Sequence, residues 1–178
     1  MRLFQYLNEE DFFEYNIFCD MDGVLCDFIG AANSIAEKMG YAGGWEPLPE
    51  DEKWAIINQE GFDFWANLDW TPDGKKLWSL IKPYRPKLLS AYVYTVDDPT
   101  IKMDCILGKL QWIKDNLGEY MTKRAIICRR DEKELWAGED NILIDDMKKN
   151  IKEWEAAGGI GIHHTSTNKT IGDLESMI

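Results

Sequence analysis

Five short apolar runs recur along the chain, and polar or glycine residues bound each of them. None of the runs alternates strictly between apolar and polar residues, which is typical of parallel strands that are covered on both faces. Between the runs, apolar residues recur at steps of three and four, as on one face of a helix. The sequence therefore predicts an α/β fold with a mainly parallel five-stranded sheet flanked by helices. The predicted strands are residues 16–19, 87–93, 124–128, 141–144 and 159–162.

Residues 41–70 break this alternation. They contain four tryptophans, three glycines and two prolines, and they show little strand character. We interpret them as a small, mostly helical insertion that follows the first core helix, which is predicted over residues 27–39. Further helices are predicted from near Pro72 to before Pro83, from Asp104 to Gly118, and between Asp146 and Gly158.

Composition narrows the classes of partner. The net charge of −12 over 178 residues repels nucleic-acid backbones and anionic membranes, so neither is expected to bind. The N-terminal residues hold no apolar segment of signal-peptide length, and no run approaches the roughly 20 apolar residues of a membrane span. Four cysteines without C-x-x-C spacing and only two histidines argue against structural zinc and favour reduced thiols. We expect a cytoplasmic protein.

Acidic residues follow two of the predicted strands. Asp20 and Asp22 come directly after the first strand, with Gly23 permitting a sharp turn, and Asp145 and Asp146 follow the fourth. Ligands of parallel sheets bind beyond the carboxyl ends of the strands. A solvated loop would explain one such aspartate, but clustered carboxylates repel one another unless a cation is present. Oxygen ligands of this kind favour magnesium, so the sequence predicts a Mg²⁺ site.

The acidic motifs occur within a longer ordered pattern. D-x-D-G-V-L-x-D-F resembles the first motif of the haloacid dehalogenase (HAD) superfamily, and N-I-L-I-D-D resembles its fourth. Between them the superfamily has a Ser or Thr after the second strand and a lysine before the acidic pair, and Ser90 and Lys133 match these positions. Thr95 is a rival to Ser90 but lies beyond the strand core. Lys123 is a rival to Lys133 but precedes a strand, which puts it at the wrong end of the sheet.

This resemblance implies a Rossmann-like HAD core and a magnesium-dependent phosphomonoesterase. Asp20 would be the nucleophile that forms an aspartyl-phosphate, and Asp22 would protonate the leaving oxygen and later deprotonate water. Ser90 and Lys133 would stabilise charge on the phosphoryl oxygens.

The resemblance also implies a ligand set for the metal. The Asp20 carboxylate, the Asp22 backbone carbonyl and Asp146 would hold Mg²⁺, with Asp145 nearby or acting through water.

Within the superfamily, the chain is most similar to the 5′(3′)-deoxyribonucleotidase family, including its bacterial and phage-type members. The similar segments are D-M-D-G-V-L-C-D-F, F-D-F-W-A-N-L, and I-L-I-D-D followed by N-I-K-E-W-E-A-A-G-G-I-G-I. The similarity implies a nucleoside monophosphate as substrate. It also implies a small helical cap at residues 30–77 inserted into a core of residues 1–29 and 78–178.

In that family, aromatic residues of the cap lie against the nucleobase. Phe28, Phe64 and Trp65 occupy the matching positions, although a small cap also needs aromatic residues to build its own core. At the second motif the chain departs from the vertebrate-type pattern, since S-A-Y-V-Y-T replaces a simpler Thr-Ser stretch.

Other functions stay open at this point. A phosphatase of the same superfamily could act on a sugar phosphate or another small phosphate ester, whereas the net charge counts against a nucleic-acid 3′ end. A receiver-like signalling domain also gathers aspartates around magnesium, but it has no aromatic insertion after the first strand. An inactive scaffold is disfavoured because every required side chain is present. Whether the chain forms a homodimer is left open.

Overall fold

A computed structural model describes residues 15–94 and 98–177. Its strands form one sheet in which every pair is parallel, with the order β3-β2-β1-β4-β5, so the predicted five-stranded sheet is confirmed. The strands are β1 (Asn16–Cys19), β2 (Lys87–Ala91), β3 (Ala125–Cys128), β4 (Asn141–Asp145) and β5 (Ile160–His163). β2 is two residues shorter than predicted, because after the bond from Tyr92 N to Cys128 O the chain leaves the sheet.

The sheet order brings the two acidic motifs together. β1 lies between β2 and β4, and Cys19 pairs with Ile144 in the β1–β4 register. The amide of Asp20 continues this pairing by donating to the carbonyl of Ile144 at 2.9 Å. Asp20, which follows β1, and Asp145, the last residue of β4, therefore start from neighbouring backbone positions.

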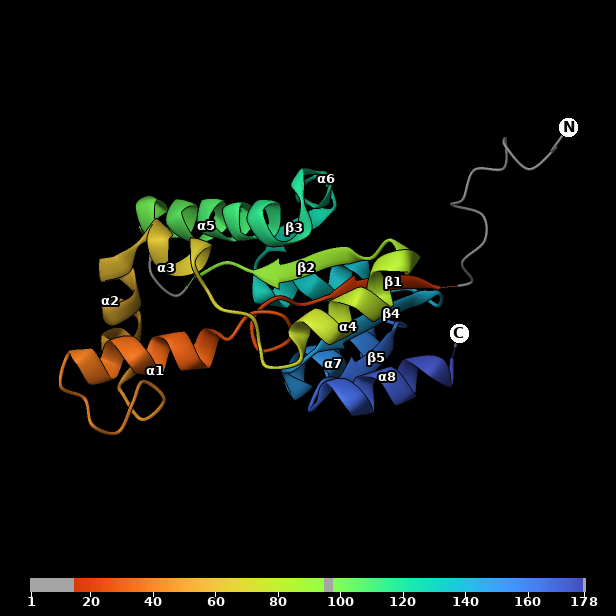
Figure 1. Cartoon of the computed structure of the whole chain (residues 1–178). Helices are drawn as coiled ribbons and strands as arrows, with labels where there is room; N and C mark the ends of the chain where they lie inside the picture. Colours follow the sequence, from red (N-terminus) through yellow and green to blue (C-terminus); the bar gives the residue numbers. More distant parts are fainter. Residues whose placement is uncertain (1–14, 95–97, 178) are drawn as a thin grey trace, which may run out of the picture.

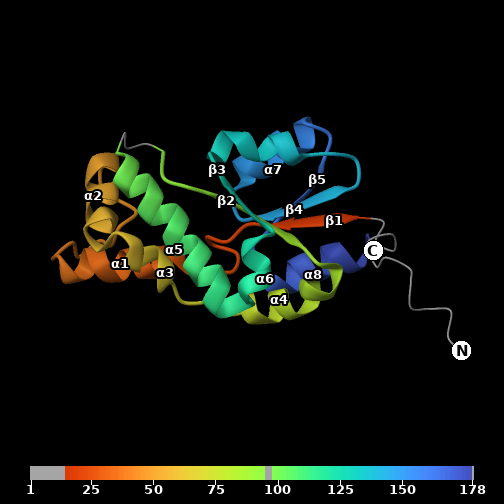
Figure 2. The same cartoon turned by 90° about the horizontal axis from the view of Figure 1, so that it is seen from above.

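Helices cover both faces of the sheet (Figures 1 and 2). On one face, Phe18, Leu89 and Leu143 pack against Ile151 and Trp154 of α7 (Lys148–Ala156). On the other face, helices α4 (Gly74–Ile81), α5 (Pro99–Leu117) and α8 (Thr167–Glu175) cover an apolar layer. The buried sheet residues in that layer are Ile17, Cys19, Leu88, Ile142, Ile144 and Ile162.

Three helices form a separate group beyond the carboxyl ends of the strands (Figure 1). They are α1 (Phe28–Lys38), α2 (Glu50–Glu60) and α3 (Phe62–Ala66), and we call this group the cap helices. The segment 41–70, predicted to be mostly helical, contains α2 and α3. The prediction of α1 as a core helix is wrong, since α1 lies beside α2 and away from the sheet (Figures 1 and 2).

Helix α5 runs from the cap helices to the sheet (Figures 1 and 2). It starts at Pro99, five residues before the predicted start, because Asp98 caps it by accepting a hydrogen bond from Thr100 N. Short elements complete the chain: η3 (Lys82–Tyr84), α6 (Glu119–Thr122) and η4 (Arg130–Trp136).

The segment that leads from the sheet to the cap helices and the segment that leads back are joined by backbone hydrogen bonds. Asp27 N donates to Asp69 O, and Thr71 N donates to Leu25 O, both at 2.8 Å. Cys26 and Trp70 form an antiparallel bridge between these contacts. Within residues 15–94 and 98–177, no helix has both the length and the apolar character needed to cross a bilayer.

Candidate active site

A tight loop after β1 brings the acidic residues of the two motifs close together. The carbonyl of Met21 accepts hydrogen bonds from the amides of Val24, Leu25 and Cys26, which folds the loop back on itself. Gly23 has a φ of 73°, and a Cβ at this position would lie 2.2 Å from Asp146 Oδ2. Gly23 therefore provides both the left-handed turn and the space that Asp146 occupies.

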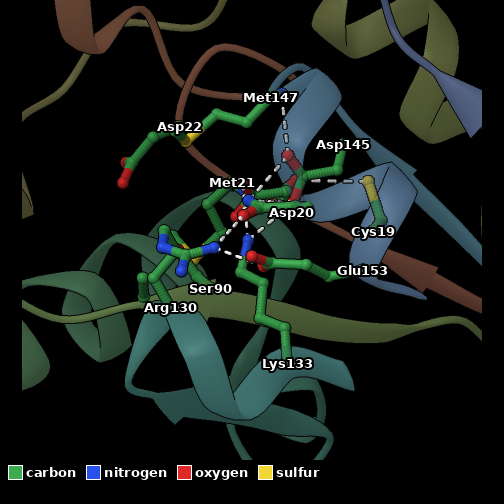
Figure 3. Close-up of polar contacts among 12 residues, drawn as sticks. Cys19, Asp20, Met21, Asp22, Ser90, Arg130, Lys133, Asp145, Met147 and Glu153 are labelled. Carbon is green, nitrogen blue, oxygen red and sulfur yellow. Dashed lines mark hydrogen bonds and ion pairs between the residues drawn. The ribbon is translucent and has the colours of Figure 1, made fainter. Parts of the chain in front are cut away.

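The carboxylate of Asp20 is held on both oxygens. Its Oδ1 accepts a hydrogen bond from Met21 N at 2.7 Å, and its Oδ2 lies 2.8 Å from Lys133 Nζ. Lys133, on η4, is almost fully buried and also binds Asp145 Oδ2 at 2.7 Å (Figure 3). One lysine thus joins the acidic residues at the carboxyl ends of β1 and β4.

Asp145 and Asp146 have different surroundings. Asp145 accepts hydrogen bonds from Met147 N and from Asn150 Nδ2, in addition to its ion pair with Lys133. Burial and the Asp20 charge raise the pKa of Asp145, while Lys133 and Asn150 oppose the rise. Within the described residues, no donor bonds the carboxylate of Asp146. Burial and the charges of Asp20, Asp145 and Asp22 raise its pKa to about 7.

Three of the four acidic side chains are placed to share a cation. One carboxylate oxygen each from Asp20, Asp145 and Asp146 lies within 4.8 Å of the others. A set of oxygen ligands fits the preference of Mg²⁺. The Asp22 carboxylate is outside this group; Figure 3 shows it to one side of the Asp20–Lys133 contact.

Lys109, on α5, was not among the predicted site residues. Its side chain is completely buried, and its ammonium contacts Asp22 Oδ2 at 2.5 Å, Ser90 Oγ at 2.9 Å and Ala91 O at 2.7 Å. A signal was present in the sequence, because Lys109 lies in the buried stripe of α5 with Cys105, Trp112 and Ile113. A charged residue in such a stripe needs a buried partner.

The structure puts the remaining predicted residues in different places. Ser90 is fully buried, accepts its hydrogen bond from Lys109 and does not line the cavity described below. Lys123 caps the C-terminal end of α6, just before β3, and is exposed at the end of the sheet away from Asp20. Thr95 lies outside the described residues.

A cavity of about 560 Å³ opens above the acidic group. Asp20, Asp22, Asp146, Arg130 and Lys133 form one part of its wall, and residues of the cap helices and their connections form another. The second part combines aromatic and acidic side chains, namely Phe28, Trp45, Trp54, Trp65, Glu46 and Glu50. The volume falls within the range of small-molecule sites.

The predicted aromatic contacts are not equally accessible. Phe28 is half-buried and lines the cavity, whereas Phe64 is buried and does not. Trp65 lines the cavity but is only 3% exposed, because Phe28 stacks on its ring at 5.7 Å and Lys109 Nζ lies 5.0 Å from the ring centroid. Of the three aromatic residues, Phe28 offers the most accessible surface to a ligand.

No protein-family model matches the chain, and no curated protein matches it either. Among solved structures, a hydrolase from Streptococcus pneumoniae TIGR4 aligns with a TM-score of 0.50 at 11% identity, over 90% of this chain and 98% of the other. A putative beta-phosphoglucomutase from Thermotoga maritima aligns with a TM-score of 0.49 at 15% identity, over 92% and 100%. A HAD-superfamily hydrolase from Geobacter sulfurreducens PCA aligns with a TM-score of 0.46 at 13% identity, over 90% and 95%.

At these identities the likeness concerns the fold. The match to the Streptococcus pneumoniae protein spans nearly all of both chains. Together with the all-parallel order β3-β2-β1-β4-β5, it confirms the predicted fold class, an α/β core with a parallel five-stranded sheet flanked by helices. The resemblance to the HAD superfamily, and the narrower one to deoxyribonucleotidases, stay predictions.

Proposed function

We propose that this chain is a magnesium-dependent phosphomonoesterase that acts through an aspartyl-phosphate intermediate. The observation that carries the proposal is the fixed carboxylate of Asp20, which lies beside Asp145, Asp146 and Lys133 in the wall of a cavity of ligand size. A nucleophile needs a defined orientation, and the contacts of Asp20 with Met21 N and Lys133 supply it.

The acidic group suits a divalent cation. In the part of the chain that the structure describes, four carboxylates, those of Asp20, Asp22, Asp145 and Asp146, face two buried ammonium groups, those of Lys109 and Lys133. Asp20 and Asp146 would hold Mg²⁺ by their carboxylates, and Asp145 would stay engaged with Lys133 and Asn150. Bound Mg²⁺ would neutralise charge on the phosphoryl group and the carboxylates.

The side chains of Asp20, Asp22 and Lys133 have different roles in the reaction. A carboxylate oxygen of Asp20 attacks phosphorus, and the ester oxygen leaves with a proton from Asp22. Water then attacks the aspartyl-phosphate, gives its proton to Asp22 and restores Asp20. Throughout, the ammonium of Lys133 keeps Asp20 in place and offsets negative charge at the reacting centre.

The substrate we propose is a nucleoside or deoxynucleoside monophosphate. The cationic side chains of Lys133 and Arg130 in the cavity wall would bind the phosphate, and Phe28, the first residue of α1, also lines the cavity. A flat apolar ring suits a nucleobase, and base stacking contributes about 1–3 kcal/mol.

The chemistry is tested with a panel of phosphate monoesters assayed in Mg²⁺. We expect the wild type to release phosphate and Asp20→Asn to lose at least a thousandfold in kcat, because an amide is a poor nucleophile toward phosphorus. Asp115→Asn is the matched control, since Asp115 is exposed on α5 and, among the described residues, its carboxylate bonds Gln111 alone. Equal phosphate release by wild type and Asp20→Asn would refute the assignment of the nucleophile.

The substrate class is tested with Phe28→Leu, which keeps apolar volume but removes the flat ring. We expect kcat/KM for nucleoside monophosphates to fall by about tenfold, in line with the loss of one stacking contact. Hydrolysis of β-glycerophosphate, which has no ring to stack, should change less than twofold. A panel in which sugar phosphates react faster than nucleotides would replace the nucleotide assignment and leave the phosphatase assignment intact.

A further inference from the structure

The ammonium group of Lys109 uses all of its donors inside the protein. A lysine has three N–H donors, and those of Lys109 are directed at Asp22 Oδ2, Ser90 Oγ and Ala91 O. The side chain is completely buried, and Lys109 is not among the residues that line the cavity. Lys109 therefore has no hydrogen bond left for a substrate, and any effect on the reaction passes through its partners.

The ion pair with Lys109 makes the two oxygens of Asp22 unequal. Oδ2 binds the ammonium at 2.5 Å. Oδ1 is the one buried side-chain nitrogen or oxygen atom in the described part of the chain that has no hydrogen-bond partner. Asp22 also lines the cavity. Oδ2 is thus anchored by Lys109, and Oδ1 is buried with no partner of its own.

Packing around Lys109 fixes the direction of this contact. Trp65 of α3 lies against the ammonium, with 5.0 Å between Nζ and the ring centroid. Gly108, the preceding residue, has the backbone of α3 so near that a Cβ would lie 2.7 Å from Phe62 O. A buried ammonium is costly unless it is paired. Lys109 therefore stays in one position, and Asp22 Oδ2 stays with it.

We propose that Lys109 is a positioning residue that anchors Asp22 by Oδ2 and so holds its carboxyl group in the cavity wall, where it exchanges a proton with the leaving group of the substrate. The inference rests on the proposed function and assigns a residue that the motifs do not contain. In the first step the P–O ester bond breaks, the phosphoryl group passes to an Asp20 oxygen, and the ester oxygen takes the proton of the Asp22 carboxyl group. In the second step water loses a proton to the Asp22 carboxylate as it attacks phosphorus, which releases phosphate and frees Asp20.

If Lys109 positions Asp22, the loss of rate on removing Lys109 should depend on the leaving group of the ester. An alkoxide is a poor leaving group and needs a proton, whereas p-nitrophenolate leaves readily without one. Proton transfer by a positioned side chain contributes typically about 10²–10⁴-fold to a rate. Removal of Lys109 should therefore slow the hydrolysis of alkyl phosphates much more than that of p-nitrophenyl phosphate. A general loss of folding would lower both rates by the same factor.

The experiment compares wild type, Lys109→Met, Asp22→Asn and the double variant on β-glycerophosphate and p-nitrophenyl phosphate in Mg²⁺. We expect Lys109→Met to lower kcat at least tenfold on β-glycerophosphate and less than threefold on p-nitrophenyl phosphate, with KM little changed. The double variant should be no slower than Asp22→Asn, because Lys109 acts through Asp22. Lys102→Met is the control, since Lys102 lies on the same helix but is exposed and contacts the ring of Tyr92.

Two results would overturn the inference. One is an equal loss on both esters in Lys109→Met, and the other is a double variant whose loss is the product of the two single losses. If Lys109→Met does not fold by circular dichroism, Lys109→Gln is measured in the same way, since its amide still donates but carries no charge. Failure of both variants to fold would assign Lys109 to stability alone. A wild type that hydrolyses neither ester, nor any nucleotide, contradicts the proposed function instead.

Discussion

Single residues at the site are constrained mostly by charge and by space. The carboxylates near the loop after β1 stay close together because Lys133 and Lys109 pair with three of them, namely Asp20, Asp145 and Asp22. Asp146 lacks such a partner among the described residues, and burial, followed by the repulsion of its acidic neighbours, raises its pKa to about 7. It is the carboxylate on which we expect a bound cation to have the largest effect.

A substitution at Gly23 tests whether the acidic group needs the space that this glycine leaves for the Asp146 carboxylate. In Gly23→Ala the new methyl group meets the Asp146 carboxylate, so Asp146 has to move away from Asp20 and Asp145. We expect the dissociation constant for Mg²⁺, measured by calorimetry, to rise at least tenfold. Gly40→Ala is the matched control, because Gly40 also has a positive φ but nothing lies within 4 Å of its Cβ position. Both variants carry the strain of alanine at a positive φ, but only Gly23→Ala should bind Mg²⁺ more weakly. Equal Mg²⁺ affinities in the two variants would contradict the placement of Asp146 against Gly23.

At the scale of elements, α5 determines how the cap helices meet the sheet. Its buried residues Trp112 and Ile113 contribute to the core beside the sheet, and Trp112 Nε1 donates to Leu68 O at 2.7 Å. Farther toward its N-terminal end, Gly108 lies against α3. The same helix carries Lys109 between these two contacts. The packing of α3 against α5 therefore also places Lys109, the residue that pairs with Asp22.

Alanine substitutions at two helical glycines, Gly108 and Gly172, distinguish the effect of packing between α3 and α5 from the effect of helix propensity. Alanine favours a helix interior over glycine by about 0.8–1.0 kcal/mol. In α8, Gly172→Ala meets nothing within 4 Å and should raise the free energy of unfolding by about that amount. Gly108→Ala places its Cβ 2.5 Å from Trp65 Cβ, so α3 must shift. We expect it to lower the unfolding free energy by about 1–3 kcal/mol, as overpacking does. Urea titration measures both; stabilisation by both variants would mean that α3 does not pack on α5 in this way.

At the scale of the whole molecule, the acidic site should make stability depend on pH and on magnesium. The pKa of Asp146 is raised from its ordinary value of 3.8 to about 7 in the folded protein, so between about pH 4 and 7 the folded state binds a proton that the unfolded state has lost. Stability contributed by this group is present at low pH and is lost as the pH rises toward 7. The raised pKa of Asp145 acts in the same direction.

The measurement is thermal unfolding in EDTA and in Mg²⁺ across pH 5 to 8. Without metal, we expect the melting temperature to fall by several degrees over this range. Mg²⁺ should raise it, and the increase should be larger at pH 8 than at pH 5, because the cation binds the ionised carboxylates. In Asp146→Asn both the pH slope and the magnesium effect should shrink. A magnesium effect that is the same at pH 5 and pH 8 would contradict a shared acidic site.

The sequence by itself determined which segments are strands and where the acidic residues lie along the chain. Buried parallel strands produce continuous apolar runs, and acidic pairs after two of them indicate one end of one sheet, so the approach of Asp20 to Asp145 was predictable. Lys133 could be selected over Lys123 for the same reason, since the two lysines lie on opposite sides of the third strand.

Tertiary structure alone decided the contacts that depend on packing between distant elements. Lys109 and Asp22 are 87 residues apart, and their pairing depends on the rotation of α5 against the loop after β1. In the same packing, the Lys109 ammonium lies against the Trp65 ring and bonds Ser90, which does not line the cavity. Local periodicity specifies which face of a helix is buried, but it does not specify which residue that face meets. Hence the carboxylates at the strand ends were predicted from the sequence, and the lysine that anchors Asp22 was found only in the folded chain.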